Sequence, residues 1–251
     1  MDEQKLLGVL GYPIEHSKSP SLFASIFREA GLINWTYERF GFANLNDFFR
    51  FSSAQKNLVG FNVTIPFKEQ IIPFLDTISP EAEALGAVNT VVCIKKGNKK
   101  HYSGFNTDVH GFEQSLSCIN NQAKNVFVLG SGGASKAICW VLQQKQIPYI
   151  VVSRNPQAEQ IEYAEIQKHL KGSNLVINCS PVGMEGPYPT LLDIPFHLFN
   201  KEDSFIDLVY QPKMTQSFMK MKQQEVECLN GEIMLSEQAN KAWQIFKHHH
   251  E

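Results

Sequence analysis

A glycine-rich turn between an apolar run and a helix-like segment constrains the fold of this chain more than any other feature. In VFVLGSGGASKA (126–137), the apolar residues lead directly into Gly130-Ser131-Gly132-Gly133, and a helical pattern follows at once from Ala134. Glycines permit a tight turn there, and they let backbone N–H groups approach an anionic group at the positively polarised start of a helix. The turn therefore favours a strand-turn-helix unit that binds a phosphate group.

The residues around this turn indicate a nucleotide-binding domain. Parallel strands that are covered on both faces read as short, continuous apolar runs. Such runs occur at 125–129, 147–153, 174–180, 204–210 and 226–230, with helical segments at 134–146 and 214–225. Their alternation predicts a βαβ domain of the dinucleotide-binding type. The pattern departs from G-x-G-x-x-G at Ser135, so an ordinary glycine-rich turn remains the alternative.

The end of the second strand of this domain indicates which dinucleotide binds. A site for NAD usually has Asp or Glu at this position, because the carboxylate accepts a hydrogen bond from the ribose 2′-hydroxyl. Here the strand ends in Ser153-Arg154-Asn155, which contains no carboxylate. A guanidinium can bind a 2′-phosphate, and Ser or Asn can donate to it. The residues therefore favour NADP over NAD, unless Arg154 is only a solvated loop residue.

The first hundred residues alternate between strand and helix patterns. Strands are predicted at 5–11, 35–42 and 58–64, two more flank a hairpin turn at Gly97-Asn98, and helices are predicted at 20–30, 44–55, 66–75 and 80–85. A last helix at 233–247 has its own apolar face, which predicts packing against this first part of the chain. Gln238 lies on that face, where its amide needs a protein or ligand partner.

Polar side chains in the first part of the chain lie at strand ends or in loops. Ser17 and Ser19 stand just before a predicted helix, and Lys68 lies in the first turn of another. Because a cation is unfavourable near a helix N-terminus, Lys68 suggests a functional role. Each feature also has a simpler interpretation: Ser19 as a helix cap, Lys68 as a surface lysine, and Asn106-Thr107-Asp108 as a capping motif.

Composition excludes several classes of protein. With 251 residues, 43% of them hydrophobic, the chain can bury a core and is not intrinsically disordered. Its 23 Lys and Arg nearly balance 25 Asp and Glu, which argues against a nucleic-acid partner. No apolar stretch reaches the length of a membrane span, and the start MDEQKLLGVLGYP is unlike a signal peptide. We expect a cytoplasmic protein that is a monomer or a homodimer.

The cysteines fit the same compartment. Cys93, Cys118, Cys139, Cys179 and Cys228 are widely scattered and form no C-x-x-C pair. We therefore expect neither a disulfide framework nor a zinc site, and we interpret the cysteines as small buried hydrophobic residues. The terminal HHHE run is not interpreted as a metal site, so no metal is predicted.

Seven short motifs, taken in their order along the chain, resemble the shikimate dehydrogenase family from Gly11 to Phe246. They are GYPIEHSKSP, FNVTIPFK, GAVNT, GFNTDVHG, the glycine loop, DLVY and GEIMLSEQ. The resemblance implies NADP-dependent, reversible reduction of 3-dehydroshikimate to shikimate, a step in the route through chorismate to the aromatic amino acids. It also implies an N-terminal α/β substrate domain at 1–106, completed by a returning C-terminal helix at 232–251. A Rossmann-type, doubly wound NADP-binding domain would occupy 107–231.

The resemblance also implies roles for individual residues. Lys68 and Asp108 match the catalytic pair of the family. Substrate-binding residues are implied at Ser17, Ser19, Thr64, Asn89, Asp108, Tyr210 and Gln238. Cofactor-binding residues are implied at Gly130, Ser131, Gly132, Gly133, Ala134, Ser153, Arg154, Asn155, Leu208 and Gly231.

The implied catalytic pair makes chemical sense. Hydride transfer to a ketone leaves negative charge on the oxygen, which must be protonated as it forms. A lysine ammonium, whose ordinary pKa is about 10.4, can supply that proton. A nearby Asp108 carboxylate would orient the ammonium and favour its charged form. The sequence leaves open whether Lys68 transfers the proton or mainly orients the hydroxyl.

Two features depart from the family pattern, and two alternative functions stay open. After Arg154 a β-like stretch at 161–166 leaves almost no room for the usual intervening helix, and the usual Asn-Arg-Thr is Ser-Arg-Asn here. We therefore expect a more open adenine side of the cofactor pocket. The alternatives are a quinate/shikimate dehydrogenase that uses NAD or NADP, and a non-catalytic regulator that binds a dinucleotide or a shikimate-like ligand. Retention of Lys68 and Asp108 weighs against the regulator.

Overall fold

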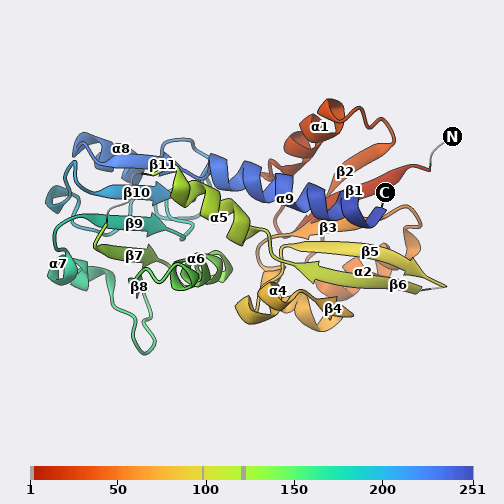
Figure 1. Ribbon diagram of the computed structural model, residues 1–251, viewed down its shortest axis with the longest axis horizontal. Helices are drawn as coiled ribbons and strands as arrows, with labels where there is room; N and C mark the ends of the chain where they lie inside the picture. The colour runs from red at the N-terminus through yellow and green to blue at the C-terminus, as the bar shows by residue number, and fades with distance from the viewer. Residues whose placement is uncertain (1–2, 98, 120–122, 251) are drawn as a thin grey trace. The chain divides into compact units, whose positions relative to one another are not determined.

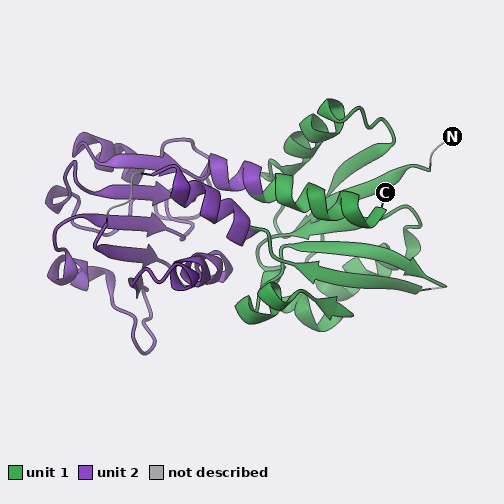
Figure 2. Cartoon of the chain, in the orientation of Figure 1, with its two compact units in different colours: residues 1–107, 238–251 green, residues 108–237 purple. Residues whose placement is uncertain are grey.

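A computed structural model describes residues 3–97, 99–119 and 123–250 of the chain. The chain divides into two compact units, coloured separately in Figure 2. Unit 1 comprises residues 1–107 and 238–251, and unit 2 comprises residues 108–237. Each unit is built on one sheet with helices (Figure 1). The two-domain α/β class predicted from the sequence is confirmed.

Unit 1 contains a six-stranded mixed sheet in the order β2-β1-β3-β5-β6-β4. The strands are β1 (Lys5–Gly11), β2 (Trp35–Gly41), β3 (Gly60–Val63), β4 (Thr77–Ile78), β5 (Thr90–Lys96) and β6 (Lys99–Phe105). β1 pairs in parallel with β2 and β3, whereas β5 is antiparallel to β3 and β6. The carboxyl ends of β1 and β3 and the amino end of β5 therefore meet at one edge of the sheet.

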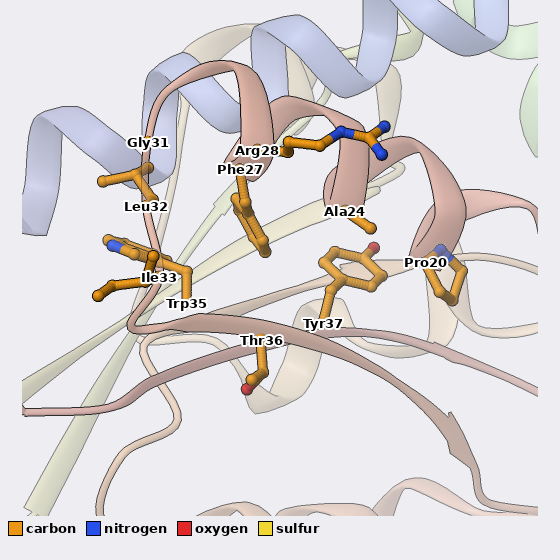
Figure 3. Close-up of a pocket in the computed structure, with 10 residues that line it drawn as sticks. All are labelled: Pro20, Ala24, Phe27, Arg28, Gly31, Leu32, Ile33, Trp35, Thr36 and Tyr37. Carbon is orange, nitrogen blue, oxygen red and sulfur yellow. The ribbon is translucent and has the colours of Figure 1, made fainter.

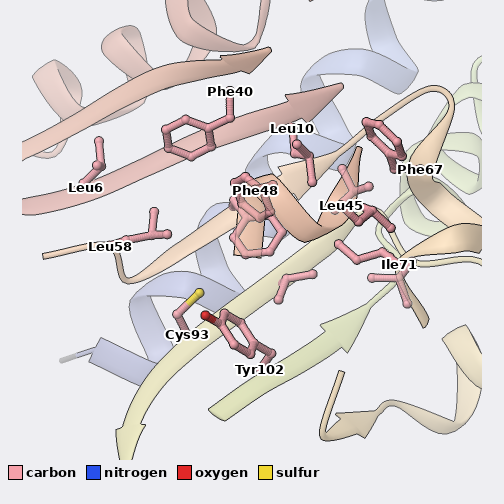
Figure 4. Packing of buried hydrophobic residues seen from close by; sticks show 14 of the residues in the cluster. Leu6, Leu10, Phe40, Leu45, Phe48, Leu58, Phe67, Ile71, Cys93 and Tyr102 are labelled. Atoms are coloured by element: carbon pink, nitrogen blue, oxygen red, sulfur yellow. The ribbon is translucent and has the colours of Figure 1, made fainter. Parts of the chain in front are cut away.

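One face of this sheet carries an aromatic core under α2 (Figure 4). The helices of this part are α1 (Ser19–Glu29), α2 (Leu45–Ala54), α3 (Phe67–Gln70), the 3₁₀ helix η1 (Ile72–Phe74) and α4 (Pro80–Leu85). Phe48 of α2 meets Phe61 of β3 edge to face, with 4.7 Å between ring centroids. Both rings are fully buried, which fixes β3 and the loop that follows it.

The last helix, α9 (Glu232–His250), packs on the first part of the chain, as predicted. Its residues Ala239, Ala242, Trp243 and Phe246 recur at helical spacing and are buried. They join Phe23 and Phe27 of α1 in a second core of unit 1. Trp243 contacts Phe27 with ring centroids 5.4 Å apart.

Unit 2 contains a five-stranded, all-parallel sheet in the order β11-β10-β9-β7-β8. The strands are β7 (Asn125–Leu129), β8 (Tyr149–Val152), β9 (Asn174–Asn178), β10 (Ser204–Asp207) and β11 (Glu227–Asn230). The helices are α5 (Asp108–Ser117), α6 (Gly133–Gln144), η2 (Tyr163–Glu165), α7 (Ile166–His169), η3 (Phe196–Leu198) and α8 (Gln216–Gln223). The strand order reverses beside β7, so the glycine-rich turn leaves the sheet at the switch point where dinucleotides bind in doubly wound folds.

The structure corrects two predictions of local structure. The helix predicted at 66–75 is interrupted after Gln70, because Pro73 has no N–H for a continuing α-helix, and only the 3₁₀ turn η1 follows. The stretch 161–166 is not a strand: Ile161 forms a single bridge to Val152, and Glu162 and Glu165 form a capping box that starts η2. A short helical segment, η2 with α7, therefore does connect β8 to β9.

Three further sequence predictions concern particular residues or segments. β5 and β6 pair antiparallel on either side of the predicted hairpin turn, in which Asn98 lies outside the described residues. Cys118 is exposed, which contradicts its interpretation as a buried residue, whereas Cys93 is buried. In the described part of the chain, no helix combines the length and the apolar character that a membrane crossing needs.

Candidate active site

The glycine-rich turn of unit 2 requires glycine at one position and leaves space at another. Gly130 has a φ of +105°, a conformation that side chains other than glycine rarely adopt. A Cβ at Gly130 would also lie 3.3 Å from the backbone nitrogen of Ser180. At Gly132, by contrast, a Cβ would have no described atom within 4 Å. The backbone at Gly132 is therefore open to an incoming phosphate group at the start of α6.

The residues after β8 lie next to this turn. The hydroxyl of Ser153 is buried and lies 3.5 Å from the hydroxyl of Ser131. Ser153 also accepts a hydrogen bond from the backbone N–H of Asn155 at 3.3 Å. Arg154 and Asn155 are exposed. The structure thus brings the two segments predicted to bind the cofactor together at the carboxyl ends of β7 and β8.

A close backbone approach joins the ends of β10 and β11. Gly231 is buried, and a Cβ at this position would clash with the carbonyl oxygen of Leu208. Only glycine permits this approach. Close packing therefore accounts for the glycine at position 231, one of the residues predicted to bind the cofactor. Tyr210 lies two residues beyond Leu208, and burial raises the pKa of its phenol.

A buried carboxylate supports the backbone before Leu208. Asp207 accepts hydrogen bonds from the hydroxyl of Thr215 at 2.6 Å, the amide of Asn178 at 2.9 Å and the N–H of Val209 at 3.2 Å. Burial raises the pKa of Asp207, and these three donors lower it. The network ties the ends of β9 and β10 to one carboxylate. Asp207 belongs to the DLVY motif of the sequence, which by itself assigned no role to this carboxylate.

The donor set in unit 2 fits NADP. A 2′-phosphorylated dinucleotide needs open backbone N–H groups for its pyrophosphate and cationic or hydroxyl donors for its 2′-phosphate. The turn at Gly132 offers open backbone N–H groups for the pyrophosphate. Arg154 and the hydroxyls of Ser131 and Ser153 offer the donors for the 2′-phosphate. In the described part of the structure, no group of three or more His, Cys, Asp or Glu side chains is arranged to hold a metal ion.

In unit 1 the two predicted serines follow β1. Ser17 accepts a hydrogen bond from the N–H of Ser19 at 3.3 Å, and its carbonyl oxygen accepts one from Arg39 at 2.7 Å. The interpretation of Ser19 as a helix cap is wrong, because α1 starts at Ser19 itself and the capping position is Lys18. Instead, the side chain of Ser19 lies near the phenol of Tyr37, whose pKa burial raises and Ser19 lowers.

Tyr37 connects this serine to a buried polar network that sequence reasoning missed. Its hydroxyl donates to the side-chain oxygen of Asn62 at 2.8 Å, and burial raises its pKa so that it stays a donor. The Asn62 amide in turn donates to the carbonyl oxygen of Asn89 at 3.2 Å and to the hydroxyl of Thr90 at 3.0 Å. The available signal was Asn62 itself, since a polar residue inside a buried strand needs partners.

Asn89 joins the segments that carry the two predicted catalytic residues. Its amide oxygen accepts from the N–H of Thr107 at 2.8 Å, and its amide nitrogen donates to the hydroxyl of Thr107 at 3.1 Å. The N–H of Val88 donates to the carbonyl oxygen of Lys68 at 2.8 Å. Asp108 follows Thr107 directly, is buried, and begins α5. The role of Asn106-Thr107-Asp108 therefore extends beyond a helix cap, because Thr107 is bonded to Asn89.

The predicted substrate residues of unit 1 gather at one sheet edge. Ser17 and Ser19 follow β1, Thr64 follows β3, and Asn89 precedes β5. Thr64 is tied to β1, because its N–H donates to the carbonyl oxygen of Leu10 at 2.9 Å. Gln238 lies half-buried on α9. Asp108 and Tyr210 belong to unit 2, at the start of α5 and after β10.

A separate surface cavity of about 550 Å³ lies between α1 and β2 (Figure 3). Its lining includes Phe27, Trp35 and Arg28. No residue predicted to bind substrate or cofactor is among its lining residues, so this cavity is not the candidate active site.

Comparisons with known proteins agree with the motifs. Residues 9–91 match the model of the shikimate dehydrogenase substrate binding domain. The chain is 34% identical to the NADP-dependent shikimate dehydrogenase of Methanococcus maripaludis over 96% of this chain and 91% of that protein. Among solved structures, the shikimate dehydrogenase of Aquifex aeolicus has a TM-score of 0.85 and 31% identity, covering 98% of this chain and 93% of its own. The Thermus thermophilus enzyme, solved with NADP(H) and shikimate, has a TM-score of 0.81 and 30% identity. The match covers 98% of this chain and 94% of the Thermus thermophilus chain.

Proposed function

The chain belongs to the shikimate dehydrogenase family, and from this premise we propose that Lys68 and Asp108 carry the proton chemistry of its reaction. The reaction is the NADP-dependent, reversible reduction of 3-dehydroshikimate to shikimate. The cytoplasmic location and the monomeric or homodimeric state stay predictions from the sequence.

The polar residues at the sheet edge of unit 1 form the proposed substrate site. The hydroxyls of Ser17 and Ser19 hold the substrate carboxylate, since two neutral donors can bind an anion without a fixed cation. Thr64, Asn89 and Gln238, together with Tyr210 and Asp108, surround the carboxylate and the ring hydroxyls. The hydrogen bond from Tyr37 to Asn62 and the contact of Tyr37 with Ser19 support this assignment, because they fix one wall of the site.

Lys68 is the proposed proton donor. When bound, NADPH supplies a hydride to the carbonyl carbon of the substrate. The ammonium of Lys68 donates a proton to the carbonyl oxygen as negative charge develops there, and the product is the alcohol. Asp108 accepts a hydrogen bond from the ammonium and holds it in line. In the reverse direction, neutral Lys68 accepts the hydroxyl proton.

The proposed division of labour assigns substrate binding to 1–106 with the helix 232–251, and NADP binding to 107–231. In the NADP site, the turn from Gly130 to Ala134 binds the pyrophosphate, and Ser153, Arg154 and Asn155 bind the 2′-phosphate. Leu208 and Gly231 shape the nicotinamide end. The open backbone at Gly132 and the absence of a carboxylate at the end of β8 support these roles.

The observation that carries the catalytic assignment is the double hydrogen bond between Asn89 and Thr107. It fixes the residue before Asp108 to the same backbone segment that binds the carbonyl oxygen of Lys68. A scaffold that positions these two segments together is what a proton-transfer pair requires.

A steady-state assay across two substrates and two cofactors tests the function. We expect the highest kcat/KM with shikimate and NADP. Comparable kcat/KM for quinate, or for NAD, would instead identify a quinate/shikimate dehydrogenase. Calorimetric binding of shikimate and NADP without turnover would identify a non-catalytic regulator.

A further inference from the structure

Two asparagine–aspartate pairs join the neighbouring strands β9 and β10, one at each end. At the amino end, the side-chain amide of Asn174 donates to the carboxylate of Asp203 at 2.7 Å. At the carboxyl end, the amide of Asn178 donates to the carboxylate of Asp207 at 2.9 Å. All four side chains are buried. The two pairs therefore differ only through the other groups that their members contact.

On one side, Asn178 holds the backbone that leads to the proposed nicotinamide end of the site. Its carbonyl oxygen accepts a hydrogen bond from the N–H of Leu208 at 3.0 Å. The Asp207 carboxylate, which the Asn178 amide binds, accepts from the N–H of Val209 at 3.2 Å. The first two residues after β10 are therefore bonded to Asn178, directly at Leu208 and through Asp207 at Val209.

On the other side, the same side chain holds the segment next to the glycine-rich turn. The amide oxygen of Asn178 accepts from the N–H of Ser180 at 3.0 Å and from the Ser180 hydroxyl at 2.6 Å. A Cβ at Gly130 would lie 3.3 Å from that backbone nitrogen, so the two backbones approach closely. Asn178 thus lies between the turn proposed to bind the pyrophosphate and the backbone proposed to shape the nicotinamide end.

An amide is the side chain that satisfies both neighbours. Its oxygen can accept two hydrogen bonds and its nitrogen can donate two. In Asn178 all four are formed, because the nitrogen also donates to the carbonyl oxygen of Val182 at 3.2 Å. An ionised carboxylate here could accept from Ser180, but it would have no proton to donate to Asp207.

We propose that Asn178 is a positioning residue for hydride transfer, which acts through Asp207 and Ser180 to fix the backbone at Leu208 relative to the glycine-rich turn. The inference rests on the proposed function and deepens it, because it explains how two separate cofactor segments of unit 2 keep one geometry.

Asn178→Ala removes the amide and leaves the proposed cofactor-binding residues in place. We expect hydride transfer, followed by the absorbance of NADPH formed in a single turnover, to slow about tenfold, because the nicotinamide end is less well positioned. Adenosine 2′,5′-bisphosphate lacks the nicotinamide, and its affinity by calorimetry should not change. A purely structural role would lower the melting temperature and leave hydride transfer in the folded protein unchanged.

Asn178→Asp is a second variant of almost the same shape. Its carboxyl group can donate to Asp207 only while the two groups share a proton, whose pKa is raised by the repulsion between adjacent carboxylates. We therefore expect hydride transfer in this variant, relative to the unaltered protein, to slow as the pH rises and the proton is lost. A ratio that stays constant over the pH range in which both proteins are folded would contradict the role of this bond.

Asn174→Ala and Asn174→Asp are the matched controls, because they break the corresponding pair at the opposite end of the strands. There, Asn174 also binds the backbone of Lys171 and Gly172, in the loop before β9. Both controls should lower the melting temperature and leave hydride transfer unchanged.

Three results would overturn the role of Asn178: unchanged hydride transfer in Asn178→Ala, the same slowing in Asn174→Ala, or an equal loss of bisphosphate affinity. If the unaltered protein binds neither NADP nor the bisphosphate, the proposed cofactor site itself fails. That outcome is distinguishable, because it does not depend on any variant.

Discussion

Asn89 holds Thr107 by both ends of its side-chain amide, with 2.8 Å between the amide oxygen and the N–H of Thr107 and 3.1 Å between the amide nitrogen and its hydroxyl. Both residues are buried. Because Thr107 precedes Asp108, these two hydrogen bonds fix the backbone that carries the proposed catalytic carboxylate. The contribution of the two bonds to stability and turnover can be tested directly.

Thr107→Val should weaken this arrangement without changing the volume of the side chain. The Asn89 amide nitrogen loses its acceptor, and we expect the free energy of unfolding to fall by about 1 kcal/mol. We also expect kcat to fall while KM for NADP stays unchanged, because the carboxylate is less well positioned. Urea unfolding and steady-state kinetics measure the two effects. Thr77→Val is the control, since the Thr77 hydroxyl bonds Ser103 in an exposed position; equal kinetics in both variants would contradict the positioning role.

Lys68→Ala should separate binding from chemistry. Without the ammonium, the developing oxyanion has no proton donor, and we expect kcat to fall by a factor of about 10² to 10⁴. Shikimate affinity, measured by calorimetry, should change far less, because the serine hydroxyls and Asn89 remain. Turnover at the normal rate in this variant would remove Lys68 from the mechanism.

The sequence predicted the parts of the fold that depend on local pattern. The apolar runs of unit 2, the helix at 80–85 and the apolar face of α9 each follow from residues that are neighbours along the chain. The helix at 66–75 was predicted wrongly, because the prediction gave the helix-like start at Pro66 more weight than the helix-breaking effect of Pro73. The stretch 161–166 was predicted wrongly because its Ile and Tyr residues favour strands, whereas the capping box of Glu162 and Glu165 prevails.

The candidate site includes contacts between residues far apart in the sequence, which a local sequence pattern cannot predict. Ser17, Thr64 and Lys68 were found because they stand in recognisable motifs. Tyr37 was missed, because its partner Asn62 lies 25 residues away and only the register of β2, β1 and β3 brings them together. Partners of this kind follow from strand order, which a single sequence does not state.

Arg154→Ala should change cofactor preference. The exposed guanidinium is the proposed partner of the 2′-phosphate, and one charge-assisted contact is worth about 1.5 to 3 kcal/mol. We therefore expect KM for NADP to rise by at least about tenfold, with little change in KM for NAD. Raising the salt concentration should weaken NADP binding in the unaltered protein more than in the variant. Equal losses for both cofactors would contradict the assignment.

Two glycine-to-alanine changes should differ in their effect on stability. Gly231→Ala places a methyl group against the carbonyl oxygen of Leu208, which the backbone cannot avoid without moving, and we expect a loss of about 1 to 3 kcal/mol. Gly132→Ala has an ordinary φ of −82° and open space around the new methyl, so the melting temperature should hold while NADP binds more weakly. Calorimetric melting of both variants measures the two effects on stability, and a destabilised Gly132→Ala would contradict the open space around Gly132.

The cysteines should differ in their reactivity with pH. Burial raises the pKa of Cys93 to about 12, an effect that the nearby charge of Lys100 only partly offsets. Since the thiolate is the nucleophile, about one molecule in ten thousand is reactive at Cys93 at pH 8, and this fraction grows about tenfold with each pH unit below the pKa. Cys118 is exposed, so an aromatic disulfide reagent at pH 8 should label it first, and Cys118→Ser should remove that fast phase. Fast labelling of Cys93 in the folded protein would mean that the sheet of unit 1 opens around β5 far more readily than its buried core allows.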